Sequence, residues 1–417
     1  MACGCDDDCD AKQKLMPVDQ ALALLLDNAT LPTETETVAL IDAGGRILAE
    51  DICSTLNVPP ADNSAMDGYA VRSCDFANAE KYSLPISQRI CAGSVGTKLK
   101  ANTVARIFTG ASIPEGADAV IMQEYCEVNG NHMISSGPVV AGTNLRKAGE
   151  DIAIGDTILK TGAKLKPQDL GLAASVGVSQ LKVYRRLRVG IFFTGDELCE
   201  PETKLKAGQI YNSNRYTLRG LLQNLGCEII DLGIVKDTLE ATREAMIEAA
   251  EKSDLVMTSG GVSVGEEDYV RIALEELGQL ALWRINIKPG KPLAFGHIGT
   301  TPFLGMPGNP VSVFVTFCVF AHPYIQKKSG ATNVLPNSFM TPANFAWKKK
   351  GYRCEYVRVR AEKDASGKSS LTLFSHQGSG VLTSTSWANG LAVIPANTSL
   401  EEGDLVEFIP FSEIGVY

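Results

Sequence analysis

The turn at residues 259–265, Ser-Gly-Gly-Val-Ser-Val-Gly, carries three glycines and two hydroxyls. It follows the apolar run 254–258 and precedes a helical pattern. A strand, a glycine turn and a helix start in this order place backbone N–H groups around an anion. Gly260, Gly261 and Ser263 are therefore suited to a phosphate-like ligand. The turn is neither a Walker loop nor G-x-G-x-x-G, and a tight turn that needs glycine for a positive φ is the alternative interpretation.

Further polar turns follow the other short apolar runs of this region. Lys288 and Lys291 bracket a Pro-Gly pair, and their charge favours an anion. Hard oxygen donors stand in separate turns at Asp196, Glu197, Asp237 and Asp268, and such donors suit Mg²⁺ better than zinc. Of these, Glu197, Asp237 and Asp268 are the predicted metal ligands. Asp237 and Asp268 also suit helix N-caps. The turns are Thr194-Gly195-Asp196-Glu197, Val235-Lys236-Asp237, Ser259–Ser263, Lys288–Pro292 and Gly305–Pro310.

Alternating strands and helices are predicted to position these turns, which implies a mostly parallel, doubly wound sheet. Ligands of such sheets bind outside the carboxyl ends of the strands. Coincident polar turns at that edge favour a binding site over simple connections. The expected strands are 187–193, 228–232, 254–258, 281–287, 293–296 and 301–304, and the expected helices are 213–225, 239–252, 268–277 and 310–328.

The whole chain of 417 residues is too long for one ordinary core. We expect a multidomain α/β protein. The predicted units are a disordered acidic, cysteine-containing tail (1–15), a discontinuous mixed domain (16–56 and 146–186), an inserted small β domain (57–145), the α/β domain (187–334) and a C-terminal all-β domain (335–417).

Composition excludes some classes of protein. A net charge of −9 gives no electrostatic footprint for nucleic acid. No run of 18 apolar residues indicates a membrane span, and the acidic N-terminus is unlike a secretory signal, so we expect a cytoplasmic protein. Most cysteines stand singly in apolar runs, as in a reducing compartment. Cys3, Cys5 and Cys9 could hold a soft metal, although a disordered tail is the favoured interpretation.

Hydrolase patterns based on a covalent nucleophile or a zinc–histidine centre are missing from the sequence. The 4 histidines are dispersed, and neither G-x-S-x-G nor H-E-x-x-H occurs. Metal-assisted phosphoanhydride or transfer chemistry fits the polar turns better.

Nine segments in order resemble the MoeA family of molybdopterin molybdenumtransferases, which includes the E domain of gephyrin. They span nearly the whole chain after the N-terminal tail. Ala61 stands where the family often has an aromatic residue. The segments are DNSAMDGYAV (62–71), FTGASIPEGADAVIMQE (108–124), RKAGEDI (146–152), TGDEL (194–198), GQIYNSN (208–214), TSGGVSVGEEDYV (258–270), IKPGKPLAFG (287–296), LGMPGNPVS (304–312) and HQGS (376–379).

The resemblance implies a role in molybdenum cofactor biosynthesis. The substrates would be molybdate and adenylylated molybdopterin, and a Mg²⁺-dependent cleavage of the adenylyl group would release AMP. It also implies an elongated homodimer whose active site is shared between subunits, with a molybdopterin adenylyltransferase as the upstream partner.

The resemblance further implies site residues by position. On the inserted-domain side these are Asp67, Thr109, Arg146 and Asp151. On the α/β and C-terminal side they are Glu197, Asp237, Asp268, Lys288, Pro307, Pro310 and Ser379, with Ser259, Gly260, Gly261, Ser263 and Lys291 from the polar turns. Arg284 stands where the family often has lysine, which keeps the charge but changes the donor geometry.

Two other functions stay open at this point. A molybdopterin adenylyltransferase has a fold similar to that of the α/β domain, but that family consists of the single domain. A non-catalytic scaffold is the second alternative, because the eukaryotic relative also clusters receptors. The intact set of carboxylates and lysines argues against that reading.

Overall fold

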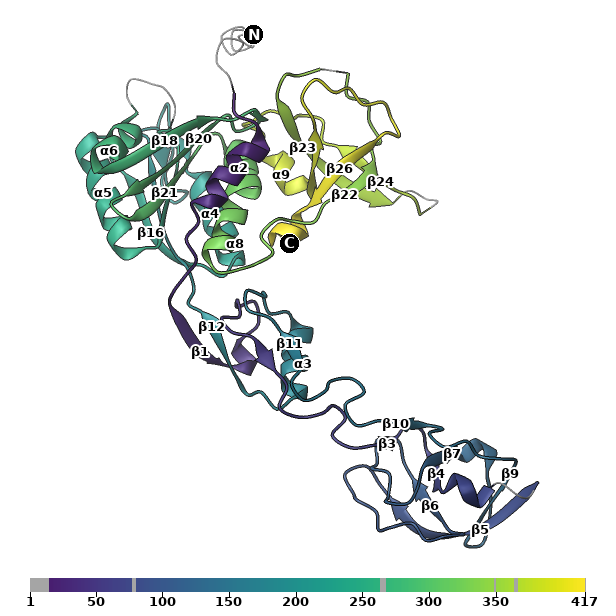
Figure 1. The fold of residues 1–417 in the computed structure, drawn as a ribbon. Helices are drawn as coiled ribbons and strands as arrows, with labels where there is room; N and C mark the ends of the chain where they lie inside the picture. Colours follow the sequence, from purple (N-terminus) through teal and green to yellow (C-terminus); the bar gives the residue numbers. More distant parts are fainter. Residues whose placement is uncertain (1–14, 77–79, 263–267, 349, 364–366, 417) are drawn as a thin grey trace.

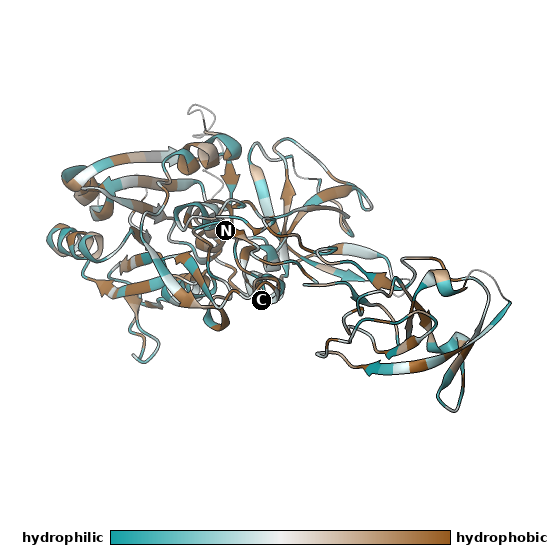
Figure 2. Ribbon diagram, turned by 60° about the horizontal axis from the view of Figure 1, so that its bottom comes forward, coloured by the Kyte–Doolittle hydropathy of each residue, from teal (hydrophilic) through white to brown (hydrophobic). Residues whose placement is uncertain are grey.

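The protein is elongated in its computed structural model (Figure 1). The α/β and C-terminal domains form one large body. The discontinuous domain lies between this body and the inserted domain, which forms the opposite end of the molecule. The turned view of Figure 2 shows the same separation of the inserted domain from the large body. The structure describes residues 15–76, 80–262, 268–348, 350–363 and 367–416.

A six-stranded sheet forms the centre of the α/β domain, and it contains β13 (Arg188–Thr194), β16 (Glu228–Val235), β17 (Leu255–Ser259), β18 (Gly278–Arg284), β20 (Pro292–Ile298) and β21 (Thr301–Met306). The strand order is β16-β13-β17-β21-β20-β18. The first four strands are parallel, whereas β20 is antiparallel to both of its neighbours. Strands β13 and β17 are buried almost throughout, as expected for apolar strands that are covered on both faces.

Helices cover both faces of this sheet, which confirms the predicted doubly wound class. One face packs against α4 (Ser213–Asn224) and the continuous helical segment of α7 (Pro310–Thr316), η4 (Phe317–Ala321) and α8 (His322–Lys328). The other face packs against α5 (Leu239–Lys252) and α6 (Tyr269–Leu277). Asn212 and Thr238 cap α4 and α5 with side-chain oxygens that accept backbone N–H groups.

The N-terminal helix α2 (Val18–Asp27) belongs to the large body. The sequence pattern assigns this helix to the discontinuous domain, but its buried residues Ala21 and Leu25 join the core formed by α8 and the central sheet. Periodicity showed that one face of this helix is buried, and it did not show which partner covers that face.

Short strands build the discontinuous and inserted domains. The first contains β1 (Thr35–Ala39), η1 (Leu40–Asp42), β2 (Ile52–Cys53), β11 (Thr157–Leu159), α3 (Pro167–Ser175) and β12 (Gln180–Tyr184). The inserted domain has a sheet in the order β7-β4-β6-β5-β9-β8. Its elements are β3 (Asn63–Ser64), β4 (Gly68–Val71), η2 (Ser73–Phe76), β5 (Lys81–Ile90), β6 (Val104–Ile107), β7 (Ala119–Met122), η3 (Gln123–Tyr125), β8 (Glu127–Asn129), β9 (His132–Ser136) and β10 (Leu145–Arg146).

The two connections to the inserted domain run side by side. The backbone N–H of Val58 donates to the carbonyl of Ile152 at 2.8 Å, and the N–H of Ile152 donates back at 3.2 Å. The pair β3–β10 continues this contact. The chain therefore enters and leaves the inserted domain at adjacent points.

The C-terminal domain shares its sheet with the α/β domain. Its strand order is β19-β23-β25-β26-β22, with β24 on β23. Strand β19 comes from the α/β region of the chain and pairs in parallel with β23. The elements are β19 (Ile287–Lys288), β22 (Phe339–Pro342), β23 (Cys354–Lys363), β24 (Ser369–Leu373), α9 (Thr383–Trp387), β25 (Gly390–Ile394), β26 (Leu405–Pro410) and η5 (Phe411–Ile414). None of the helices formed by the described residues combines the length and the apolar character that crossing a bilayer requires.

Candidate active site

A cavity of about 890 Å³ opens at the carboxyl edge of the central sheet. Its wall comes from the turns after β13, β17 and β21, the turn that precedes β20, and a turn of the C-terminal domain. Because β20 runs antiparallel, its first residues lie at the edge where the parallel strands end. The predicted site residues that line the cavity are Glu197, Ser259, Gly260, Gly261, Lys288, Lys291, Pro307, Pro310 and Ser379.

Glycine is required at two positions of the turn after β17. Gly260 and Gly261 have φ values of 90° and 63°, in the left-handed region. A Cβ on Gly261 would lie 2.6 Å from Cγ2 of Val270, so the turn is packed against the start of α6. Asn214 fastens the turn from the side, because its Nδ2 donates to Ser259 Oγ at 3.2 Å and to the carbonyl of Gly308 at 2.7 Å. These contacts hold Ser259 and Gly261 in place at the cavity wall.

The lysine turn is held by the C-terminal domain. Nζ of Lys288 lies 3.0 Å from Oε2 of Glu355, whose side chain is 6% exposed. The buried carboxylate therefore orients the ammonium and offsets its charge. Gly290 has a φ of 110°, and a Cβ there would lie 2.4 Å from Cγ2 of Thr316. The turn is thus locked between α7 and β23.

Two arginines of the C-terminal domain were missed by the sequence analysis. Arg353 lines the cavity, and Arg358 is 1% exposed. The Arg358 guanidinium donates to Ser384 Oγ at 3.0 Å and to the carbonyl of Gly378 at 3.3 Å, so it supports the turn that carries Ser379. Burial lowers the pKa of Arg358 to about 10, which leaves it charged at neutral pH. Arg358 stands between Val357 and Val359 in β23, and a charged residue flanked by valines in a strand was the signal that could have revealed it.

Other predicted residues of this side lie off the cavity wall. Asp237 follows β16 and Arg284 ends β18, and these are the two outermost strands of the sheet. Asp268 is 5% exposed at the N-cap position of α6, and its side chain makes no capping bond to the helix. Thr238, not Asp237, caps α5. Ser263 lies outside the described residues.

The predicted Mg²⁺ ligands do not form a complete protein cage. In the described part of the chain, no group of three or more His, Cys, Asp or Glu side chains is close enough to hold a metal ion. Glu197 is the one of the three predicted ligands that lines the cavity. Mg²⁺ often takes only one or two carboxylates and completes its shell with water and substrate phosphates. The residues present fit that kind of shared site.

The inserted domain carries a second group of predicted residues. Asp67 Oδ1 accepts hydrogen bonds from the backbone N–H and the hydroxyl of Thr109, both at 2.8 Å. These bonds, together with the charge of Arg106, lower the pKa of Asp67 below its usual value. Arg146 lies in β10, and Asp151 follows it where the chain leaves the domain. All four lie in the inserted domain or at its base, away from the large body that contains the cavity (Figure 1).

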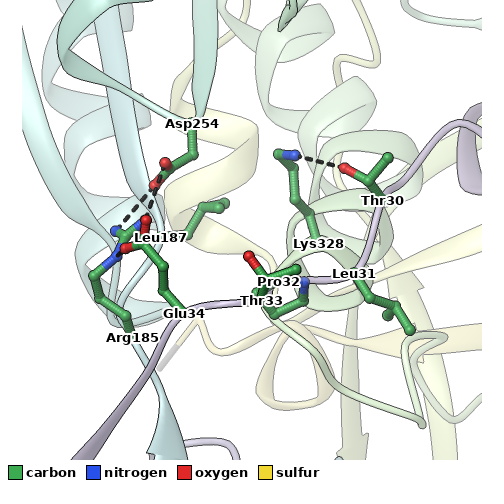
Figure 3. A pocket seen from close by; sticks show the side chains of 9 residues that line it. All are labelled: Thr30, Leu31, Pro32, Thr33, Glu34, Arg185, Leu187, Asp254 and Lys328. Atoms are coloured by element: carbon green, nitrogen blue, oxygen red, sulfur yellow. Dashed lines mark hydrogen bonds and ion pairs between the residues drawn. The ribbon is translucent and has the colours of Figure 1, made fainter.

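A second, smaller cavity of about 210 Å³ lies between the large body and the discontinuous domain. Figure 3 shows the carboxylates of Glu34 and Asp254 directed to the guanidinium group of Arg185, and Lys328 directed to Thr30. Arg185 pairs with both carboxylates, and Nη2 of Arg188 lies 3.0 Å from Oδ1 of Asp254. This cavity contains none of the predicted site residues and marks a junction between domains.

Comparison with known proteins identifies the family. Three family descriptions match successive parts of the chain: "MoeA N-terminal region (domain I and II)" over residues 16–177, "Probable molybdopterin binding domain" over 190–327, and "MoeA C-terminal region (domain IV)" over 341–411. The molybdopterin molybdenumtransferase of Haemophilus influenzae is 40% identical over 96% of this chain and 100% of its own length. The chain belongs to the MoeA family of molybdopterin molybdenumtransferases.

Other members of the MoeA family are similar to this chain over nearly its full length. The molybdopterin molybdenumtransferase of Bacillus subtilis is 34% identical, over 96% of this chain and 95% of its own. A crystal structure titled as the molybdopterin biosynthesis MoeA protein of Pyrococcus horikoshii superposes with a TM-score of 0.83, at 31% identity, over 95% of this chain and all of that one. The MoeA assignment therefore covers every domain described above.

Proposed function

We propose that this protein ligates molybdenum from molybdate to the dithiolene sulfurs of adenylylated molybdopterin and cleaves the adenylyl group, which releases AMP and molybdenum cofactor. The observation that carries the proposal is the meeting of a glycine turn, two lysines and Arg353 around one cavity. Its volume of about 890 Å³ lies within the range of small-molecule sites. Membership of the MoeA family supports the substrate class.

The cationic side of the cavity binds the anionic parts of the substrates. Lys291 and Arg353 lie on the wall beside Lys288, and the buried guanidinium of Arg358 adds positive potential behind the Ser379 turn. Backbone groups of the glycine turn would receive phosphate oxygens. In the cleavage step, water adds across the phosphoanhydride bond, and the products are AMP and the phosphate of the molybdenum cofactor.

Mg²⁺, when bound, would neutralise phosphate oxygens during this cleavage. Glu197 would hold the ion from the protein side, and the substrate phosphates would complete its shell. The chain itself supplies the binding pocket, the orientation of the phosphates and the exclusion of competing ligands.

The proposed active site is shared between two copies of the chain. Asp67 and Thr109 form a hydrogen-bonded pair on the inserted domain, at the far end from the cavity. An elongated subunit whose inserted domain reaches the cavity of its partner would bring the two groups together. Such a two-fold arrangement creates two equivalent sites in each dimer.

Release of AMP tests the proposed reaction. The purified protein is incubated with adenylylated molybdopterin, Mg²⁺ and molybdate, and AMP is measured by chromatography. We expect release that depends on molybdate, because insertion of the metal and cleavage belong to one reaction. No AMP under these conditions would contradict the proposal. Formation of adenylylated molybdopterin from ATP and molybdopterin would instead favour the adenylyltransferase.

A further inference from the structure

Two arginines face each other across neighbouring strands of the inserted domain. Arg89 of β5 is paired in register with Arg106 of β6. Both guanidinium groups lie over the ring of Phe108, Arg89 at 4.7 Å and Arg106 at 4.6 Å from its centroid. They therefore share one face of the sheet and one aromatic support.

Neither cation of this pair forms a close ion pair with a carboxylate of the described residues, and Asp67 interacts with Arg106 only at longer range. In the part of the chain that the structure describes, no Asp or Glu oxygen lies within 4.0 Å of either guanidinium. Like charges directly opposite each other on neighbouring strands destabilise a sheet. A structural role would be served better by one arginine and one carboxylate, so the pair points to a ligand.

The two arginines differ in how many donors they have already used. Arg106 donates to the carbonyl of Gly68 at 2.9 Å and to Oε1 of Gln123 at 2.5 Å, and it also lies over the ring of Tyr69. Arg89 is exposed, and in the described structure its contact is the ring of Phe108. Stacking on the ring restricts the guanidinium plane and leaves its N–H groups directed outward.

The pair also borders the proposed catalytic group. Phe108 directly precedes Thr109, whose hydroxyl and backbone N–H bond to Asp67. The charge of Arg106 contributes to the lowered pKa of Asp67. Phe108 therefore connects the arginine pair with the Thr109–Asp67 group, and an anion held at Arg89 would lie in the same region of the inserted domain.

We propose that Arg89, supported by Phe108 and by Arg106 as a positioning residue, binds a phosphate group of the adenylylated substrate that is seated in the partner's cavity. A guanidinium presents a planar fork of donors that matches phosphate oxygens. The inference rests on the proposed function, because the phosphate is that of the proposed substrate. It makes the inserted domain a binding surface as well as a source of catalytic groups.

The test uses the full chain with Arg89→Ala, Arg89→Lys and the control Lys81→Ala. Lys81 is an exposed cation at the start of the same strand, far in sequence from the Phe108 ring. We expect Arg89→Ala to raise KM for adenylylated molybdopterin about tenfold, with kcat changed less than about twofold, because one charge-assisted contact is lost. Arg89→Lys should recover part of this loss, and Lys81→Ala should match the wild type. An unchanged KM in Arg89→Ala would overturn the inference and leave the proposed function intact.

A second measurement separates the inference from the reaction itself. Binding of inorganic pyrophosphate to the wild type and to Arg89→Ala is measured by titration calorimetry at low salt. Weaker binding by the variant supports an oxyanion site even if the wild type releases no AMP, whereas equal binding contradicts it. The melting temperature of Arg89→Ala should be equal to that of the wild type or higher, since a like charge is removed. A clear fall would assign Arg89 a structural role instead.

Discussion

Asp67 and Asp51 have the same local hydrogen bonds in different domains. Asp67 accepts from the backbone N–H and hydroxyl of Thr109, and Asp51 accepts from the same groups of Thr161, with all four distances at 2.8 Å. In both cases these bonds lower the pKa of the carboxyl group. The two aspartates therefore make similar contributions to folding, and only Asp67 belongs to the predicted site.

This pairing allows a controlled test of Asp67. We expect Asp67→Asn to lower the rate of AMP release about a hundredfold or more, because it removes a charge at the reacting group. The matched control Asp51→Asn should lose a similar small amount of thermal stability and keep its activity. Calorimetry and the AMP assay measure the two effects. Equal activity in the two variants would show that Asp67 serves only to fix its turn.

At the scale of elements, the junction between the large body and the discontinuous domain depends on Asp254. Burial acts to raise the pKa of Asp254, but hydrogen bonds from Arg185 and Arg188 outweigh it and lower the pKa to about 2. Arg185, which follows β12, is also paired with Glu34, which precedes β1. The ion pairs thus connect both chain segments that pass between the domains (Figure 3).

The lowered pKa of Asp254 determines how its contribution to the stability of the fold changes with pH. The carboxylate stabilises the fold above its ordinary pKa of 3.8, and this contribution is lost as the pH falls toward about 2. Asp254→Asn should lower the free energy of unfolding by about 2 kcal/mol at neutral pH, and the difference should shrink at acid pH. Chemical denaturation at several pH values measures it. A pH-independent difference, or an equal loss in the surface control Glu248→Gln, would contradict this role.

The sequence predicted elements better than the contacts between them. The alternation from residue 187 onward predicted the strands and helices of the α/β domain, because apolar periodicity reports which faces are buried. Strand β22 gives no such signal, since its residues are half-exposed or exposed and show no alternation. The polar turns were correctly placed at one edge. Asp237 and Arg284 lie off the cavity because their strands are outermost in the sheet, and strand order is not encoded locally.

At the scale of the whole molecule, one chain holds two groups of predicted site residues that are far apart (Figure 1). The residue patterns alone did not show this separation, whereas the resemblance to the MoeA family implied it by assigning the two groups to different domains. In the arrangement we propose, a second copy of the chain brings its inserted domain to the edge of the large body, so that the two groups meet. Mixed dimers of two different variants test whether the active site is shared in this way.

Mixed dimers of two inactive variants should recover activity. One variant carries Asp67→Asn and the other Glu197→Gln, and they are unfolded and refolded together. Random pairing gives half mixed dimers, each with one intact site, so we expect about a quarter of wild-type activity. The control mixture combines Glu197→Gln with Lys291→Ala. Both substitutions alter the same cavity, so a mixed dimer contains no unaltered cavity and should not recover a quarter of wild-type activity. No recovery in the first mixture would contradict the shared site.

The paired connections at Val58 and Ile152 have an evolutionary consequence. Because the chain leaves and re-enters at adjacent points, the residues between them could be removed and the ends closed by a short turn without crossing another strand. The gene segment that encodes such a domain could be replaced by another without changing the rest of the chain. In the arrangement we propose, the surface of the inserted domain that carries Arg89 could then change without any change in the residues that line the cavity of the large body.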